Sequence, residues 1–238
     1  MASAQTASSM AVQVDVNSPT SVSDGSLRAW IKRFDAIYRE SEGRCASIPW
    51  AHSQPCPSLL AWLNAEAPSL VRPGARTAVV GCGLGQDAVV LSERGYDVTA
   101  FDICSSAVDH ARSLHPQYQD IFCQADVLDM PGRLTGRFDL VVEVHTLQAL
   151  PPEFRVPLAN GMASLLSHHG ILVAVARGRD PELDLGSLAG PPWEFTPGEL
   201  TETLSEAGLS AVRSIDDFLD DNDPPVRRLR GIFARSGS

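Results

Sequence analysis

Three glycines stand close together in the stretch TAVVGCGLGQDAVVL, which covers residues 77–91. Gly81, Gly83 and Gly85 follow a short apolar run and precede a pattern typical of a helix. A glycine-rich turn at the exit of a strand lets a ligand lie directly on the backbone, where the N–H groups of the next helix face its polar atoms. A tight turn alone would also favour glycine, so the motif needs support from other residues.

Two carboxylates provide that support. Asp102 ends the next apolar segment, YDVTAFD, where it is well placed to accept hydrogen bonds from both ribose hydroxyls of a nucleoside. Asp126 ends the segment QDIFCQAD, where it could bind an adenine amino group. Because parallel strands end at one edge of a sheet, we expect the glycines and both carboxylates to line one crevice. The sequence therefore predicts a site for a nucleoside cofactor.

The start of the following helix distinguishes two such cofactors. NAD requires the spacing G-x-G-x-x-G, with its pyrophosphate at the helix N-terminus. Here GCGLGQD brings the third glycine one place early and puts Asp87 in the first turn of the helix. A carboxylate at that position repels a pyrophosphate and suits a cation. S-adenosylmethionine (SAM), which carries a sulfonium and an ammonium group, is therefore favoured, and a nicotinamide oxidoreductase is the weaker alternative.

The segments that must position these residues alternate between strand and helix. Strands that are apolar throughout are typical of a parallel sheet covered on both faces, so we expect an α/β fold. The predicted parallel strands are RTAVVG, YDVTAFD, QDIFCQAD, RFDLVVEVHT and GILVAVARG. Near the end of the chain, SAVRSIDDFLD and PVRRLRGIFAR are separated only by a short loop, so we expect them to form an antiparallel pair.

Two loops outside this core each carry a tryptophan. Trp50 lies in SIPWAHSQP, and Trp193 lies in GSLAGPPWEF. Together with Phe34 or Trp30 from the predicted first helix, they would form an apolar wall over the sulfonium, because aromatic faces attract cations. Packing that only anchors the loops and the helix to the core is the alternative. We expect a disordered tail over residues 1–24, an N-terminal helical lid segment over 25–74 and a SAM-binding core over 75–238.

These segments resemble a known family. The stretch VVGCGLGQDAVVLSERGYDVTAFDICSSAVDHAR is similar to the first two motifs of class I SAM-dependent methyltransferases. Within that class, GCGLGQD and GPPWEFTPGEL resemble the branch of the thiopurine and thiol methyltransferases and the tellurite-resistance methyltransferases. The resemblance extends over about residues 25–235. It implies a doubly wound, seven-stranded, mostly parallel Rossmann-like sheet with an antiparallel last strand.

The resemblance also implies roles for residues that match the family's motifs. The glycine turn would contact the methionine and ribose parts of SAM, the end of the second strand the ribose and adenine, and the end of the third strand the adenine. The end of the fourth strand would lie next to the methyl donor. The implied cofactor-binding residues are Gly81, Cys82, Gly83, Gly85, Asp87, Asp102, Ile103, Asp126, Val127, Glu143 and Val144.

The acceptor decides whether a base is needed. A thiol loses its proton readily near neutral pH, whereas a hydroxyl or amine usually requires a base. His145 and Glu143 are the candidate catalytic residues, although either could have a purely structural role, and Glu143 could instead bind the methionine ammonium. Arg177 could hold an anionic acceptor. The residues expected at the acceptor site are Trp50, His52, Phe34, Trp193 and Arg177.

Net charge and cysteine spacing limit the partners and the cellular compartment that we expect for this protein. A formal net charge of −10 argues against nucleic acid or an anionic membrane surface. The sequence contains neither an apolar run long enough to span a membrane nor a secretory signal pattern. The five cysteines show no C-x-x-C spacing, so we expect no metal site and no disulfide framework. A reducing cytoplasm fits this pattern best.

We therefore expect a cytoplasmic SAM-dependent methyltransferase, monomeric or homodimeric, that acts on a small molecule, above all a thiol. An O- or N-methyltransferase of a secondary metabolite is the alternative enzyme. A non-catalytic SAM-binding regulatory module is the alternative from another class, because the same glycine turn would occur in either.

Overall fold

The computed structural model describes residues 27–183 and 190–237, so the predicted tail over residues 1–24 lies outside the described part of the chain. A central sheet has the strand order β3-β2-β1-β4-β5-β8-β6, with β7 paired to β8 beside this path. Its strands are β1 (Arg76–Val80), β2 (Asp97–Asp102), β3 (Phe122–Gln124), β4 (Phe138–Val144), β5 (Leu166–Arg177), β6 (Leu209–Ala211), β7 (Asp216–Leu219) and β8 (Arg227–Arg235).

The strands from β3 to β5 pair in parallel, and β8 is antiparallel to β5, β6 and β7. The predicted mixed sheet is therefore confirmed. One expected strand is divided in two, because β6 pairs with residues 233–235 of β8 and β7 with residues 227–230. Between the two segments, the Arg213 guanidinium pairs with Glu66 and Asp216, at 2.8 and 2.6 Å. The two segments share one position at the edge, so seven positions hold eight strands.

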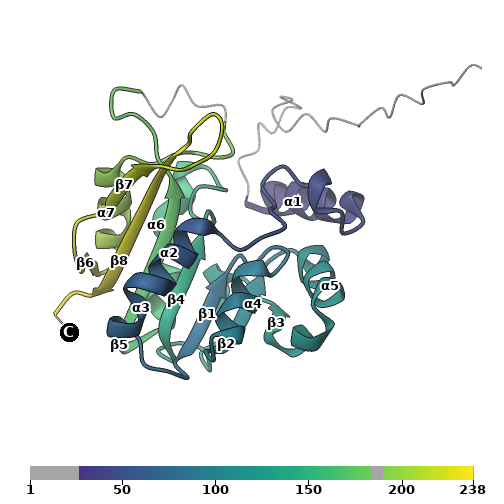
Figure 1. Cartoon of the computed structure of the whole chain (residues 1–238), viewed down its shortest axis with the longest axis horizontal. Coiled ribbons are helices and arrows are strands. Elements are labelled where there is room, and N and C mark those ends of the chain that lie inside the picture. Colours follow the sequence, from purple (N-terminus) through teal and green to yellow (C-terminus); the bar gives the residue numbers. More distant parts are fainter. Residues whose placement is uncertain (1–26, 184–189, 238) are drawn as a thin grey trace, which may run out of the picture.

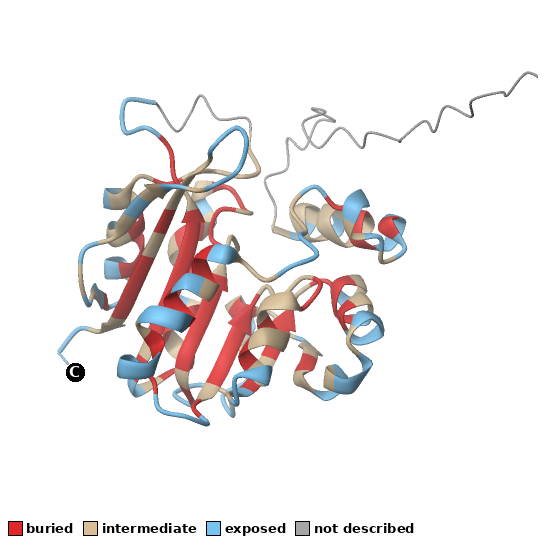
Figure 2. Cartoon of the chain, viewed as in Figure 1, coloured by how far each residue is buried: buried red, intermediate tan, exposed pale blue. Residues whose placement is uncertain are grey.

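Helices cover both faces of the sheet (Figure 1). One buried cluster joins the strands to α6 (Arg155–Leu165) and α7 (Pro197–Glu206). A second cluster joins the other face to α2 (Pro57–Ala65), α3 (Ala67–Leu70), α4 (Gln86–Glu93) and α5 (Ser105–Leu114). The strands are buried along most of their length between these layers (Figure 2), as expected for strands that are apolar throughout.

The helix α1 (Leu27–Ser41) lies at the carboxyl end of the parallel strands, beside α5 (Figure 1). Two hydrogen bonds join these helices: the Ser106 N–H donates to Asp35 Oδ1 at 3.1 Å, and His110 Nε2 lies 2.8 Å from the Tyr38 carbonyl oxygen. A third buried cluster connects α1 to the glycine turn through Tyr38 and Leu84. The first helix is thus placed over the predicted crevice.

Short 3₁₀ turns complete the connections: η1 (Cys45–Ser47), η2 (Pro116–Ile121), η3 (Val127–Asp129) and η4 (Pro152–Phe154). The start of α7 is a capping box, in which the Thr196 hydroxyl accepts from the Glu199 N–H and the Glu199 carboxylate accepts from the Thr196 N–H. In the described part of the chain, every helix is too short or too polar to cross a lipid bilayer.

Candidate active site

The glycine turn connects β1 to α4 through backbone that other residues rarely adopt. Gly81, Gly83 and Gly85 have φ angles of +64°, +52° and +90°. A Cβ atom on Gly81 would lie 2.4 Å from Thr146 Oγ1, and one on Gly85 would lie 2.6 Å from the Phe122 ring. Both the turn and the close approach of neighbouring side chains therefore require glycine at these positions.

Asp102 ends β2 directly beside this turn. Its Oδ2 accepts the Gly83 N–H at 3.0 Å, and its Oδ1 accepts the Cys104 N–H at 2.9 Å. Burial raises the pKa of the carboxyl, and the same two hydrogen bonds oppose that rise. A carboxylate oxygen has two lone pairs, so each oxygen retains capacity for a ligand hydroxyl. The neighbouring Cys82 thiol has a pKa raised well above its ordinary value, first by burial and then by Asp102, so it is a poor nucleophile.

Asp87 connects the glycine turn to the N-terminal part of the chain. It lies in the first turn of α4, where its Oδ1 accepts the Cys56 N–H at 2.7 Å. Cys56 immediately precedes α2. Burial raises the pKa of Asp87, whereas this hydrogen bond and His52 lower it. In this arrangement Asp87 holds the loop that carries Trp50 and His52 close to the crevice.

The predicted adenine-side residues lie at the next two strand ends. Asp126 Oδ1 accepts the Leu128 N–H at 2.8 Å and caps η3. Val127 is buried in the cluster on the α6 face, and Ile103 packs partly buried against the cluster that connects α1 to the glycine turn. Val144 packs partly buried against the cluster on the opposite face.

Glu143 is fully buried near the end of β4, in register with Val80, the last residue before the glycine turn. Its Oε2 accepts the N–H groups of Thr146 and Leu147 at 2.7 and 3.2 Å. Among the described residues, its Oε1 is buried without a hydrogen-bond partner. Burial raises the pKa of Glu143 to about 7. A buried carboxylate oxygen without a partner is costly, so the site is suited to a donor or a cation from a ligand.

His145 follows β4 in a left-handed conformation, with φ +64°, and its N–H donates to the Val175 carbonyl oxygen at 2.9 Å. Its Nε2 lies 3.3 Å from Arg228 Nη1. Burial, followed by the charges of Arg228, His52 and Arg177, lowers the pKa of His145 to about 3. An imidazole with so low a pKa is a weak base at neutral pH, which argues against general-base catalysis by this residue.

The expected aromatic residues gather in one wall. The ring of Trp30 lies 5.2 Å from Trp193 and 6.1 Å from Phe34, and Phe34 lies 5.3 Å from Trp50. Tyr38 continues the wall, because its ring lies 5.8 Å from Trp50 and its hydroxyl accepts the Trp50 Nε1–H at 2.9 Å.

Tyr38 also lies over the glycine turn, since a Cβ on Gly83 would be 3.1 Å from the Tyr38 hydroxyl oxygen. Tyr38 is not among the site residues predicted from the sequence. The available signal was its position four residues after Phe34, on the same face of the first helix.

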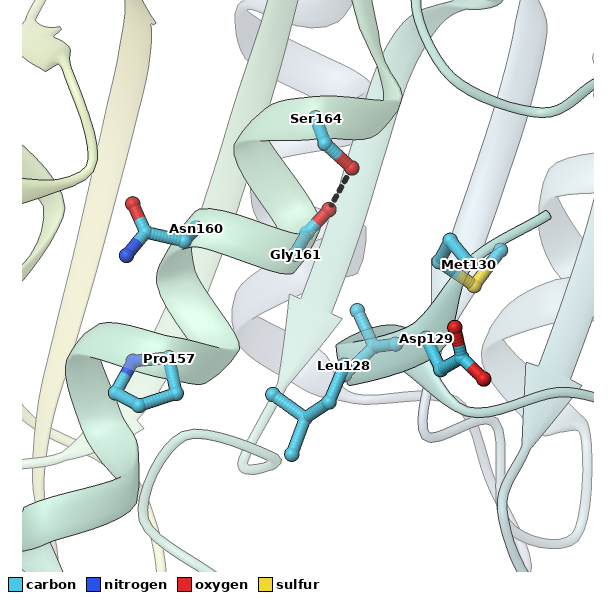
Figure 3. A pocket seen from close by; sticks show the side chains of 8 residues that line it. Leu128, Asp129, Met130, Pro157, Asn160, Gly161 and Ser164 are labelled. Carbon is cyan, nitrogen blue, oxygen red and sulfur yellow. Dashed lines mark hydrogen bonds between the residues drawn. The ribbon is translucent and has the colours of Figure 1, made fainter. Parts of the chain in front are cut away.

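Arg177, the last residue of β5, is connected to the aromatic wall through Glu194. Its Nε lies 2.7 Å from Glu194 Oε1, next to Trp193 in the chain. The expected anion-binding guanidinium is thus already paired with a carboxylate. An open groove of about 460 Å³ lies elsewhere, between η3 and α6 (Figure 3). Of the predicted site residues, its lining includes Val127 alone, and none of the glycines, carboxylates or aromatic residues described above.

Within residues 27–183 and 190–237, no three His, Cys, Asp or Glu side chains are arranged to hold a metal ion.

Comparisons with known proteins identify the family and the fold. The chain is 26% identical over 203 residues to a probable thiol methyltransferase of Arabidopsis thaliana, a match that covers 83% of this chain and 80% of the relative. Its fold matches a solved structure from work on the conversion of a disulfide bond into a thioacetal group in echinomycin biosynthesis, with a TM-score of 0.69, 22% identity and coverage of 87% and 94%.

A second solved structure is the 1,6-didemethyltoxoflavin-N1-methyltransferase of Burkholderia thailandensis with bound S-adenosylhomocysteine. It matches with a TM-score of 0.66 and 20% identity over 88% of this chain and 89% of that one. The sequence profile of thiopurine S-methyltransferases matches residues 44–232, which include the glycine turn, every parallel strand and the Trp193 segment. The chain therefore belongs to the thiopurine S-methyltransferase family of SAM-dependent methyltransferases.

Proposed function

We propose that this enzyme methylates the sulfur of a small-molecule thiol, with SAM as the methyl donor. The observation that carries the choice of acceptor is the environment of His145. Its Nε2 lies 3.3 Å from Arg228 Nη1, and burial together with this positive charge lowers the pKa of the imidazole to about 3, so it can act only as a weak base. A thiol needs less help than a hydroxyl or an amine, because its pKa of about 8.5 leaves a small fraction ionised near pH 7 and the thiolate is a strong nucleophile. The similarity to a probable thiol methyltransferase supports the same choice.

The cofactor side of the crevice fits SAM. The Oε1 atom of Glu143, buried without a described partner, suits the α-ammonium group, and the remaining lone pairs of Asp102 suit ribose hydroxyls. The backbone of Gly81, Gly83 and Gly85 allows the closest approach of the ligand chain. When bound, SAM supplies a methyl group already activated by a positively charged sulfur.

The residues on the acceptor side have two tasks. The wall of Trp30, Phe34, Trp50 and Trp193 excludes water from the reacting atoms and presents aromatic faces to a cation. In-line displacement also requires that the acceptor be held in one orientation, which rigid aromatic walls achieve. On this view residues 25–74 act as a lid, of which the structure describes the part from Leu27 onward. His145 then orients the acceptor and does not deprotonate it.

The test is release of S-adenosylhomocysteine from SAM with small thiols, phenols and amines run in parallel. We expect release with thiols alone. Asp102→Ala is the control for the site, because this variant should bind SAM more weakly and should therefore release less S-adenosylhomocysteine. Release with phenols or amines but not thiols would replace the proposal with an O- or N-methyltransferase. Tight SAM binding without release in any reaction would favour a narrower acceptor or a binding module.

A further inference from the structure

The segment Trp193–Phe195 is held in place by polar contacts from three parts of the chain. The Trp193 N–H donates to the Gln148 carbonyl oxygen at 2.9 Å. The Phe195 N–H donates to the Arg177 carbonyl oxygen at 3.0 Å. Between them, one guanidinium nitrogen of Arg155 donates to the Trp193 and Glu194 carbonyl oxygens at 2.7 and 3.0 Å. The backbone that carries Trp193 is therefore fixed on both sides of the residue.

Arg155 is an unusual residue to find in this place. It is the first residue of α6 and is only 5% exposed. Its guanidinium lies 3.6 Å above the centre of the Phe195 ring, and its Nη1 lies 3.9 Å from Glu199 Oε2. Burial lowers its pKa to about 10, so it keeps its charge at neutral pH. A buried charge is tolerated only with partners, and here two of the partners are carbonyl groups of the Trp193 segment.

These contacts have a consequence for the acceptor site. With its carbonyl group held by Arg155, Trp193 directs its ring against Trp30 of α1, in an edge contact at 5.2 Å. The next carbonyl group is held as well, which keeps Glu194 beside Arg177 at 2.7 Å. One buried guanidinium thus sets both the apolar wall and the ion pair on the acceptor side. These contacts of Arg155 do not reach the glycine turn, Asp102 or Glu143.

We propose that Arg155 is a positioning residue for the methyl acceptor: it fixes the Trp193 segment against α1 and thereby controls acceptor binding without affecting cofactor affinity. This inference rests on the proposed function, because it assigns the Trp193 wall to the acceptor. Arg155 itself remains away from the reacting atoms and acts through the backbone of Trp193 and Glu194.

The chain offers a matched control in Arg179. Its side chain is as buried as that of Arg155, 6% exposed in each case, and it also pairs with Glu199. Its remaining side-chain hydrogen bonds go to the carbonyl oxygens of Asp180 and Leu183, not to residues 193–195. Loss of a buried arginine is common to both substitutions, whereas loss of the contacts to Trp193 occurs only at position 155.

The experiment compares Arg155→Lys and Arg179→Lys with the wild type. Lysine keeps the charge but lacks the planar guanidinium that lies over the Phe195 ring while one of its nitrogens donates to both carbonyl groups. Thiophenol at saturating SAM is the acceptor probe, calorimetry gives the affinity for S-adenosylhomocysteine, and hydrogen exchange follows residues 190–196 and α1. For Arg155→Lys we expect KM for thiophenol to rise about tenfold, with faster exchange in both segments and cofactor affinity within twofold of wild type. Arg179→Lys should leave KM within twofold.

Equal effects of the two substitutions, or a loss of cofactor affinity in Arg155→Lys, would overturn the proposal in favour of a general structural role. If Arg155→Lys does not fold, Trp193→Ala provides the second route, because it removes the ring and leaves the clamp. It should reproduce the rise in KM, and an unchanged KM would contradict the proposal. If the wild type does not methylate thiophenol, the panel of thiols, phenols and amines decides the proposed acceptor, and the exchange of residues 190–196 separately decides whether Arg155 holds this segment.

Discussion

The two halves of the crevice are built from different parts of the polypeptide. The proposed cofactor half consists of the glycine turn and the ends of the adjacent strands, with Asp102 and Glu143 as its main side chains. The proposed acceptor half consists of aromatic rings from α1, from the loop after it and from the Trp193 segment. Backbone conformation defines the first half, whereas contacts between distant side chains define the second.

This difference predicts different responses to substitution. In the cofactor half a change should damage folding or cofactor affinity, because the turn depends on the left-handed backbone of its glycines and on close approach of neighbouring side chains. In the acceptor half the rings pack through pairwise contacts of modest energy, so single changes should act on acceptor binding. The following predictions test that division, beginning with the largest expected effect.

Gly85→Ala should have the largest effect on stability. The substitution places a Cβ atom 2.6 Å from the Phe122 ring at a φ of +90°. Left-handed backbone costs about 1–2 kcal/mol and overpacking about 1–3 kcal/mol, so the free energy of unfolding should fall by about 2–5 kcal/mol. Chemical denaturation measures the loss. Gly95→Ala is the control, because Gly95 has a φ of +85° with no atom within 4 Å of the added Cβ. Equal losses in both variants would contradict the steric argument.

Glu143→Gln should remove a pH dependence of stability. The folded pKa of Glu143, about 7, is above its ordinary value of 4.5, so the folded state favours the neutral form. The contribution of Glu143 to the free energy of unfolding is greatest below pH 4.5 and decreases as the pH rises to about 7. The change over that range is about 3 kcal/mol. Denaturation of both proteins across this range measures the difference. Parallel curves for wild type and variant would mean that Glu143 does not titrate there.

Asp102→Ala should weaken the binding of S-adenosylhomocysteine by about 1–3 kcal/mol, the usual cost of losing a charged hydrogen-bond partner. It also removes the acceptor for the Gly83 and Cys104 N–H groups, so stability must be measured together with affinity. Calorimetry with the folded variant provides the value. Asp109→Ala, at an exposed position of α5, should change neither quantity. Unchanged affinity in Asp102→Ala would remove Asp102 from the cofactor site.

A double-mutant cycle between Trp30 and Trp193 should show the smallest effect. An edge contact at 5.2 Å predicts a coupling energy of about 0.5–1.5 kcal/mol. The cycle compares Trp30→Ala, Trp193→Ala and the double variant, with the free energy of unfolding as the measured quantity. Strictly additive losses would show that α1 and the Trp193 segment are energetically independent, which would also weaken the case for a coupled lid.

The sequence alone determined the order of the core elements and the candidate cofactor residues. Apolar strands alternating with helices indicate a parallel sheet, and the glycines and carboxylates at successive strand ends follow from local pattern. These features can be predicted from the sequence because β1, the glycine turn, α4 and β2 follow one another in one continuous stretch. The cap of α7 is equally local, because Thr196 and its partner Glu199 lie three residues apart.

Only the tertiary structure decided how the acceptor half is assembled. The division of the edge strand at Arg213, the place of Tyr38 over the glycine turn and the hold of Arg155 on Trp193 all depend on residues far apart in the chain. The same holds for the pKa of about 3 at His145, which arises from burial and from Arg228 on β8. Short-range spacing predicts which backbone turns and where strands end, but long-range packing determines which side chains meet and how their charges are balanced.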